Sequence, residues 1–196
     1  MEINSSKGIS KLKKYKIGMY HQSKIAHQIQ NMLNLHTDAF KTNPFASDPD
    51  KLSQFGVYQI MMNDEISLIS EQVYTPIPRG ILHSEEGILQ ALSNLIENYG
   101  VIPCVHIYTY NSPCISQRGK NIKPCFKQIA RFAKLHTSTK VRVFYSKLWK
   151  PLQSNKHFKN HMMKSESDTS ENLEYYQIDL EIKDNAIKIS KLEKIL

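Results

Sequence analysis

The chain has 196 residues, of which 40% are hydrophobic and 22% charged, a composition typical of a folded globular protein and not of a disordered one. No apolar run approaches the roughly 18 residues that a membrane-spanning helix needs, and the basic start lacks the apolar core of a secretory signal. We therefore expect no membrane association and a cytoplasmic or nuclear location.

The formal net charge is +8, and its distribution is uneven. Residues 98–165 contain no Asp or Glu, yet they carry half of the 26 Lys and Arg side chains. Such a segment attracts polyanions, and nucleic acid is the most common polyanion in a cell. Nucleic acid is therefore the expected partner, and a solvated basic face without a partner is the alternative.

The first third of the chain combines a basic arm with one helix and two strands. We expect residues 1–20 to form the arm and residues 21–196 to form a single domain, since this length suits one domain. Apolar residues at helical spacing predict a helix within residues 21–36. Two strands are then predicted in 55–64 and 65–78, with a tight turn between them.

Helices and strands alternate in the middle of the chain. Residues 81–100 predict a helix that ends at Gly100, because glycine favours the backbone conformation that stops a helix. The uncharged segment 101–112 is typical of a strand buried on both faces. A helix at 125–136 and a strand at 141–149 follow.

The last part of the chain is predicted to contain a polar loop at about 152–173, a strand at 173–182 and a closing helix at 186–196. The element order is therefore α-β-β-α-β-α-β followed by a further strand and helix. A hairpin followed by strand-helix-strand units predicts an α/β protein with a mixed five-stranded β-sheet flanked by helices.

Four residues stand where neighbouring elements of this fold would meet. His83 and Glu85 open one predicted helix, Cys114 ends the buried strand, and Cys125 opens the next helix. One imidazole and two thiolates can supply three ligands to a tetrahedral zinc ion and leave a fourth position open for water. Positions i and i+2 of a helix do not share a face, so Glu85 is expected to serve as a proton shuttle and not as a ligand.

The pattern His83-Ser84-Glu85, then Pro113-Cys114, then Cys125 resembles the signature of the zinc-dependent cytidine deaminase superfamily. Ser112-Pro113-Cys114 is most similar to the AID/APOBEC-like polynucleotide deaminases, and the resemblance covers roughly residues 57–150. It implies a cytidine-deaminase-like fold, Zn²⁺ held by His83, Cys114 and Cys125, Glu85 as the catalytic residue, and hydrolysis of cytosine to uracil in single-stranded DNA or RNA.

Ten residues separate Cys114 from Cys125, where the family usually has two, and such an insertion resembles the riboflavin-pathway deaminases. The extra loop would bring basic side chains to the pocket, and polar or aromatic residues before Cys114 would contact the base. A further polar residue in the loop before the first strand sits about where deaminases approach the target base. The expected substrate-binding residues are Asn43, Tyr110, Asn111, Ser112, Arg118, Lys120 and Lys123.

Other readings of these residues remain open. The same site could deaminate a free nucleoside or nucleotide, or could be a catalytically silent zinc-containing module that binds nucleic acid. The sequence does not separate DNA from RNA or cytosine from adenine, and it does not give the oligomeric state. A purely structural reading makes His83 a helix cap, Glu85 a solvated carboxylate and the cysteines core residues, as we interpret Cys104.

Overall fold

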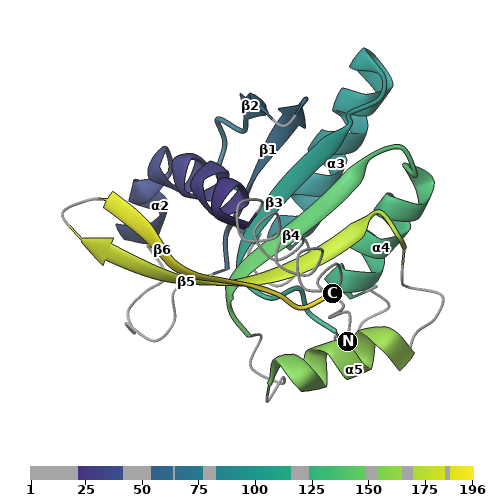
Figure 1. Ribbon diagram of the computed structural model, residues 1–196. Helices are drawn as coiled ribbons and strands as arrows, with labels where there is room; N and C mark the ends of the chain where they lie inside the picture. The colour runs from purple at the N-terminus through teal and green to yellow at the C-terminus, as the bar shows by residue number, and fades with distance from the viewer. Residues whose placement is uncertain are drawn as a thin grey trace, which may run out of the picture.

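In the computed structural model, helices pack on both sides of one curled β-sheet (Figure 1). The first described helix spans residues 22–34, and α2 (Thr37–Lys41) follows it. The other described helices are α3 (Ser84–Tyr99), α4 (Cys125–Leu135) and α5 (Asn155–Lys164). The structure describes residues 22–41, 54–63, 65–76, 83–115, 124–148, 154–164, 170–183 and 186–196.

The strands of the described chain form a six-stranded sheet in the order β2-β1-β3-β4-β5-β6. β3, β4 and β5 are parallel to one another, whereas β1 and β2 pair antiparallel at one side and β6 pairs antiparallel with β5 at the other. The strands are β1 (Gly56–Met62), β2 (Glu65–Ile69), β3 (Cys104–Asn111), β4 (Lys140–Lys147), β5 (Leu173–Lys183) and β6 (Ala186–Lys194).

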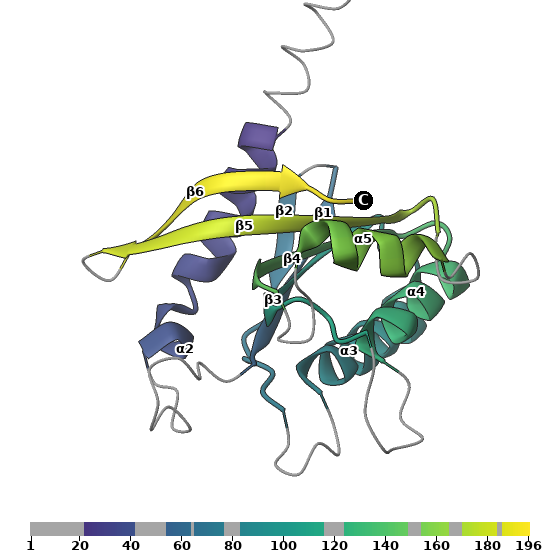
Figure 2. The same cartoon turned by 90° about the horizontal axis from the view of Figure 1, so that it is seen from below.

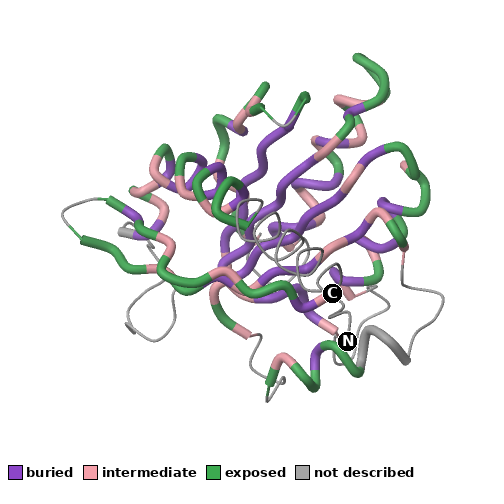
Figure 3. The backbone as a smooth tube through the Cα atoms, viewed as in Figure 1, coloured by how far each residue is buried: buried purple, intermediate pink, exposed green. Residues whose placement is uncertain are grey.

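Helices lie on both faces of the sheet (Figure 2), and its central strands β1, β3 and β4 are mostly buried (Figure 3). On one face, α3, α4 and α5 contribute Ile88, Phe126 and Phe158 to a core that includes Tyr175 of β5. On the other face, the helix at residues 22–34 packs Ile29 and its neighbours against strand residues. Burial on two sides explains why the uncharged segment predicted as a buried strand became the central strand β3.

Both helices that flank β3 begin at the carboxyl end of that strand. α3 leads into β3 and α4 leads out of it, so each runs back against the strand direction. The start of α3 and the start of α4 therefore meet at the edge of the sheet where β3 and β4 end. This is the edge at which the sequence places His83, Cys114 and Cys125.

Two elements at the C-terminal end differ from the sequence-based expectation. Residues 186–196 were expected to form a helix, but 186–194 form β6, so the prediction of five strands is wrong and the sheet has six. Ile187 and Ile189 alternate with polar residues, which is the two-residue period of a strand. The segment pairs with the edge of β5, and this pairing cannot be read from the segment alone. The cytidine-deaminase topology itself remains a prediction.

Residues 155–164 form α5 where we expected a polar surface loop. The helix is anchored by Phe158, which is fully buried among Tyr145 and Tyr175. Only Phe158, Met162 and Met163 are apolar in this segment, so its helical spacing is weak among the polar residues, which explains why the helix was missed. The basic arm at residues 1–20 lies outside the described residues.

Among the helices that the structure describes, none combines the length and the apolar character that crossing a membrane requires.

Candidate metal centre and adjoining cavity

The side chains of His83, Cys114 and Cys125 converge at the carboxyl edge of the sheet. The Nδ1 atom of His83 lies 3.0 Å from Sγ of Cys125 and 3.7 Å from Sγ of Cys114. The three ligand atoms all lie within 4.8 Å of one another, and both cysteines are buried. These residues are therefore close enough to hold a metal ion in common.

The two Pro-Cys pairs explain how the sulfurs come together. Pro113 lies two residues beyond the end of β3, and Pro124 caps the start of α4, where the missing N–H of proline costs no helical hydrogen bond. The backbone N–H of Cys125 then donates to Sγ of Cys114 over 3.2 Å. A sulfur that accepts from a helix N-terminus is stabilised as the thiolate, the form that binds metals.

The protonation of the cluster fits this arrangement. A hydrogen bond from the Cys125 thiol lowers the pKa of Cys114, and the His83 imidazole and the Cys125 backbone N–H act in the same direction. The same hydrogen bond, together with burial, raises the pKa of Cys125. The hydrogen bond with Cys114 raises the pKa of His83, although burial opposes it. The sulfurs therefore share a proton that a metal ion would displace.

The backbone of His83 is held in place by Glu86, one turn further along α3. The Glu86 carboxylate accepts the His83 backbone N–H over 2.6 Å, which is a capping interaction at the helix start. Its other oxygen accepts from Nε2 of Gln128 on α4 over 2.7 Å. Glu86 therefore ties the helix that carries the imidazole to the helix that carries Cys125.

Glu85 lies beside this group and not within it. Its carboxylate is only 2% exposed, yet it lines a cavity of about 220 Å³ together with His83 and Cys114. Burial raises the pKa of Glu85, and hydrogen bonds from its own backbone N–H and from Ser84 offset this only in part. A carboxyl group whose pKa moves toward neutrality is suited to accept and return a proton.

Gln54 fixes the Glu85 carboxylate from the far side of the cavity. Its Nε2 atom donates to Oε1 of Glu85 and to Oγ of Ser84, each over 3.2 Å. Its Oε1 atom accepts the backbone N–H of Asn111 over 2.9 Å. Gln54 lies two residues before β1, and its side chain thus links this segment to the end of β3 and to the start of α3. It also lines the cavity.

The donor set fits a zinc ion. Zinc in proteins bonds to sulfur at about 2.3 Å and to nitrogen at about 2.0–2.1 Å, so two ligand atoms of a tetrahedral site lie about 3.5–3.8 Å apart. The Nδ1–Sγ separations of 3.0 and 3.7 Å lie just below and within this range, respectively. A partly deprotonated sulfur pair with one imidazole is also the ligand chemistry that zinc prefers.

The structure brings some of the other expected residues to the cavity. Asn111 and Ser112 line it, and the backbone N–H of Ser112 donates to the carbonyl of Lys147 over 2.6 Å. Tyr110 instead points to the opposite face of the sheet, where it stacks on Phe55 within the core. Four further residues lie outside the described part of the chain, namely Asn43, Arg118, Lys120 and Lys123.

Three residues near the site were not anticipated from the sequence: Gln54, Glu86 and Lys147. Lys147 is exposed at the end of β4, in register with Asn111, and its ammonium group lies 5.4 Å from the centre of the Tyr110 ring. Its position at the carboxyl end of a strand parallel to β3 could have indicated that it lies near the site, because the carboxyl ends of parallel strands lie at the same edge of a sheet. Gln54 gave no signal, since its partners are 30 or more residues away.

Comparison with known proteins adds no assignment to this geometry: no protein-family model matches the sequence, and no curated protein matches it.

Proposed function

We propose that the protein is a zinc-dependent deaminase that hydrolyses cytosine to uracil in single-stranded nucleic acid. The observation that carries the proposal is the cavity in which a buried carboxylate, Glu85, lies beside one imidazole and one of two clustered sulfurs. The resemblance of His83-Ser84-Glu85 and Pro113-Cys114 to the deaminase signature supports the same chemistry.

In this proposal His83, Cys114 and Cys125 hold the ion. A zinc ion bound there would lower the pKa of a water molecule and so make hydroxide available at neutral pH. Glu85 accepts the proton that the attacking water loses and delivers it to N3 of the ring. The second proton of that water, on the hydroxyl group now attached to C4, goes to the departing amino nitrogen as the C4–N bond breaks. Water and cytosine thereby yield uracil and ammonia.

The rest of the cavity wall would orient the base. Gln54 holds the Glu85 carboxylate, so the shuttle keeps one position while it changes its protonation state. Asn111 and Ser112 offer polar groups on the side of the cavity formed by the end of β3. A volume of about 220 Å³ is below the roughly 300–1,000 Å³ of pockets for drug-sized ligands, which suits a single unstacked base.

The charge of the surrounding chain supports a polymeric substrate. The backbone of Lys147 pairs with Asn111 and accepts from Ser112 at the end of β4, while its exposed ammonium group lies over the Tyr110 ring. Lys147 belongs to the segment of residues 98–165 that has thirteen basic and no acidic side chains. A backbone of phosphates would gain from such a segment, whereas a free nucleoside would not.

The test compares substrates and metal content in one preparation. Oligonucleotides of DNA and of RNA with a single cytosine, and free cytidine and deoxycytidine, are incubated with the protein, and uracil and ammonia are measured. We expect one zinc per chain and uracil in at least one oligonucleotide. Turnover of only the free nucleosides would show that the substrate is a small molecule and not a polynucleotide. Zinc content with tight oligonucleotide binding but no release of ammonia would indicate a catalytically silent binding module.

Glu85→Gln tests the role of the carboxylate. We expect the variant to keep its zinc and to lose about 10²–10⁴-fold in turnover, since this is the usual contribution of a positioned acid-base group. Glu97→Gln, an exposed substitution on the same helix, is the matched control. Undiminished turnover by Glu85→Gln would show that another group moves the proton.

A further inference from the structure

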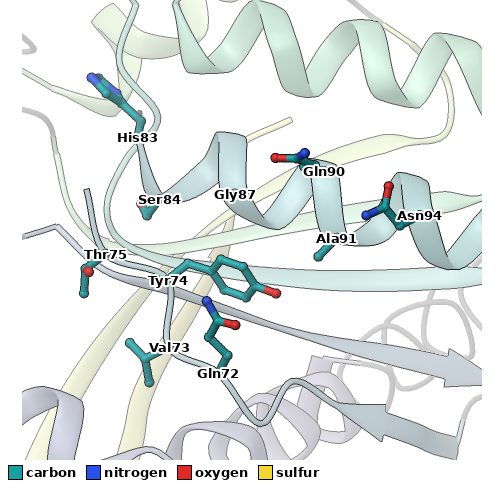
Figure 4. Close-up of a pocket in the computed structure, with 10 residues that line it drawn as sticks. All are labelled: Gln72, Val73, Tyr74, Thr75, His83, Ser84, Gly87, Gln90, Ala91 and Asn94. Carbon is teal, nitrogen blue, oxygen red and sulfur yellow. The ribbon is translucent and has the colours of Figure 1, made fainter. Parts of the chain in front are cut away.

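A second, larger cleft opens on the outer side of α3. Its volume is about 470 Å³, and it lies between the helix and the segment of residues 72–75 that follows β2. In Figure 4, Gln72 and Tyr74 stand on one side, and Ser84, Gln90 and Asn94 extend from the helix. We call this space the amide cleft, after the side chains of Gln72, Gln90 and Asn94 that line it.

The amide cleft is preformed by small residues on the helix and by a fixed opposite wall. Gly87 and Ala91 lie on the lining face of α3, and the Tyr74 ring packs so closely on Gly87 that an added Cβ there would come within 2.9 Å of it. The wall is anchored by two backbone hydrogen bonds between Tyr74 and Gly56, of 2.8 and 2.9 Å. A cleft with such walls exists before any ligand arrives.

The chemistry of the lining is polar but uncharged. None of the described residues that line the amide cleft is Asp, Glu, Lys or Arg, although the chain as a whole is rich in Lys. Apart from His83, whose ring turns away from Tyr74 and Gln72, these residues offer no cationic side chain to a phosphate group. The side-chain amides of Gln72, Gln90 and Asn94 each offer donors and an acceptor in one plane, which is the pattern that pairs with the edge of a nucleobase.

The amide cleft also adjoins the smaller cavity that holds Glu85. His83 and Ser84 line both spaces, and Thr75 of the cleft is the chain neighbour of Pro76 in the cavity wall. The His83 ring turns away from Tyr74 and Gln72 in Figure 4, so it does not fill the cleft. A strand of nucleic acid with one base in the cavity would thus find the cleft within reach of a neighbouring base.

We propose that the amide cleft binds the nucleobase next to the target cytosine and reads its edge through Gln90 and Asn94. The proposal rests on the proposed function for the choice of ligand, and it goes further by locating the residues that set sequence preference. Asn and Gln pair best with the amino group and ring nitrogen of adenine, so adenine is the expected base. A purine also suits a space twice as large as the cavity for the pyrimidine.

The experiment measures preference for the neighbouring base in two ways. Oligonucleotides with one cytosine and each of the four bases on its 5′ or 3′ side are compared for uracil formation by the wild type. The same fluorescein-labelled set is titrated with Glu85→Gln protein, which binds without turnover. We expect adenine on one side to be favoured about tenfold or more, in line with the usual discrimination of a good amide–base pair.

The double substitution Gln90→Ala and Asn94→Ala removes the reading groups. Both side chains are exposed and alanine favours helices, so we expect the fold to persist. The adenine preference should fall to within about twofold. Asn98→Ala, an exposed amide on the same helix that does not line the amide cleft, should leave the preference intact.

The outcomes separate this inference from the proposed function. Uracil formation with no neighbour preference, or with a preference that the double substitution leaves unchanged, overturns the inference while the deaminase stands. Binding preference that the double substitution abolishes, in a protein that forms no uracil, supports the cleft and overturns the deaminase. Absence of any base-dependent binding by Glu85→Gln protein also overturns the inference.

Discussion

Two clusters of buried polar side chains belong to the same sheet, and they differ in what they face. The first is the metal cluster at the carboxyl edge, where His83, Cys114 and Glu85 line a cavity. The second is a row across four strands in paired register, formed by Gln59, His106, Arg142 and Glu174, which we call the cross-strand row. No member of the cross-strand row lines either of the two cavities described above.

The members of the cross-strand row pair with one another. His106 lies 2.9 Å from Gln59 and 3.1 Å from Arg142, and Arg142 donates to Glu174 over 2.9 Å. The polar groups of the metal cluster also pair, but in addition they border open space. Apart from Oε1 of Gln59, which has no hydrogen-bond partner among the described residues, the polar groups of the row satisfy each other and so stabilise the fold. Polar groups that border a cavity are instead available to a ligand.

The three cysteines show the same difference between a cluster that borders a cavity and one that does not. Cys114 and Cys125 lie with His83, whereas Cys104 stands at the opposite end of β3, with Nη1 of Arg142 3.9 Å from its sulfur. Cys104 is half-buried and belongs to the surroundings of the cross-strand row. This placement agrees with its interpretation as a structural residue.

The largest effect expected from this comparison is on metal binding. Cys114→Ser should reduce zinc affinity by more than 100-fold, because it removes a ligand and ligand-orienting groups alone are worth 10–100-fold. Cys104→Ser should bind zinc like the wild type. Competition with a chromophoric chelator measures both, and equal losses in the two variants would remove the distinction between the clusters.

A smaller effect, on stability, is expected for Glu174→Gln. Burial would raise the pKa of Glu174, but hydrogen bonds from Lys194 and Arg142 outweigh it and lower the pKa to about 2. The folded-state pKa is depressed, so the stabilisation is present above the unfolded pKa near 4.5 and is lost as the pH falls toward 2. Solvent screens the two exposed lysines, so we expect this stabilisation to be about 2–3 kcal/mol at neutral pH.

Urea unfolding at pH 7 and pH 2.5 measures this contribution. Glu174→Gln should lower the free energy of unfolding by about 2–3 kcal/mol at pH 7 and by much less at pH 2.5. Glu193→Gln, which removes only an exposed pair with Lys191, should cost less than about 1 kcal/mol. A Glu174→Gln deficit that stays constant with pH would contradict the assignment of the charge.

The smallest effect is expected for Gln54→Ala. This substitution frees the Glu85 carboxylate without touching a ligand, so we expect turnover to fall about tenfold while zinc affinity stays unchanged. Gln22→Ala, at an exposed position of the first helix, is the control. Loss of zinc by Gln54→Ala would place Gln54 among the groups that support the metal.

Local patterns in the sequence predicted most of the fold. Apolar runs and helical spacing located β1, β3, α3, α4 and β4, and Gly100 ends α3 with a positive φ of 87° as expected. α5 and β6 were missed because each depends on a distant partner. The segment around Phe158 is mostly polar and gives only a weak helical pattern, and β6 forms by pairing with the edge of β5.

The residues of the candidate site also divide into those that the sequence pattern indicates and those that depend on distant contacts. His83, Glu85, Cys114 and Cys125 could be found because their residue types and order form a chemical pattern. Gln54 and Glu86 could not, because common residue types acquire their role only from contacts across 31 and 42 positions. Prediction from sequence thus found the residues that come together at the candidate site but not the residues that hold them in place.

Gly56 of β1 lies where α3 packs closely on the sheet beside β3. A Cβ atom at Gly56 would lie 2.7 Å from Cδ1 of Ile88 on α3 and 3.0 Å from the carbonyl oxygen of Tyr108 on β3. A methyl group at Gly56 would therefore have to displace the end of the Ile88 side chain and press on the β3 backbone. Glycine at this position permits the close packing of α3, which carries the imidazole, on β3, which leads to the first sulfur.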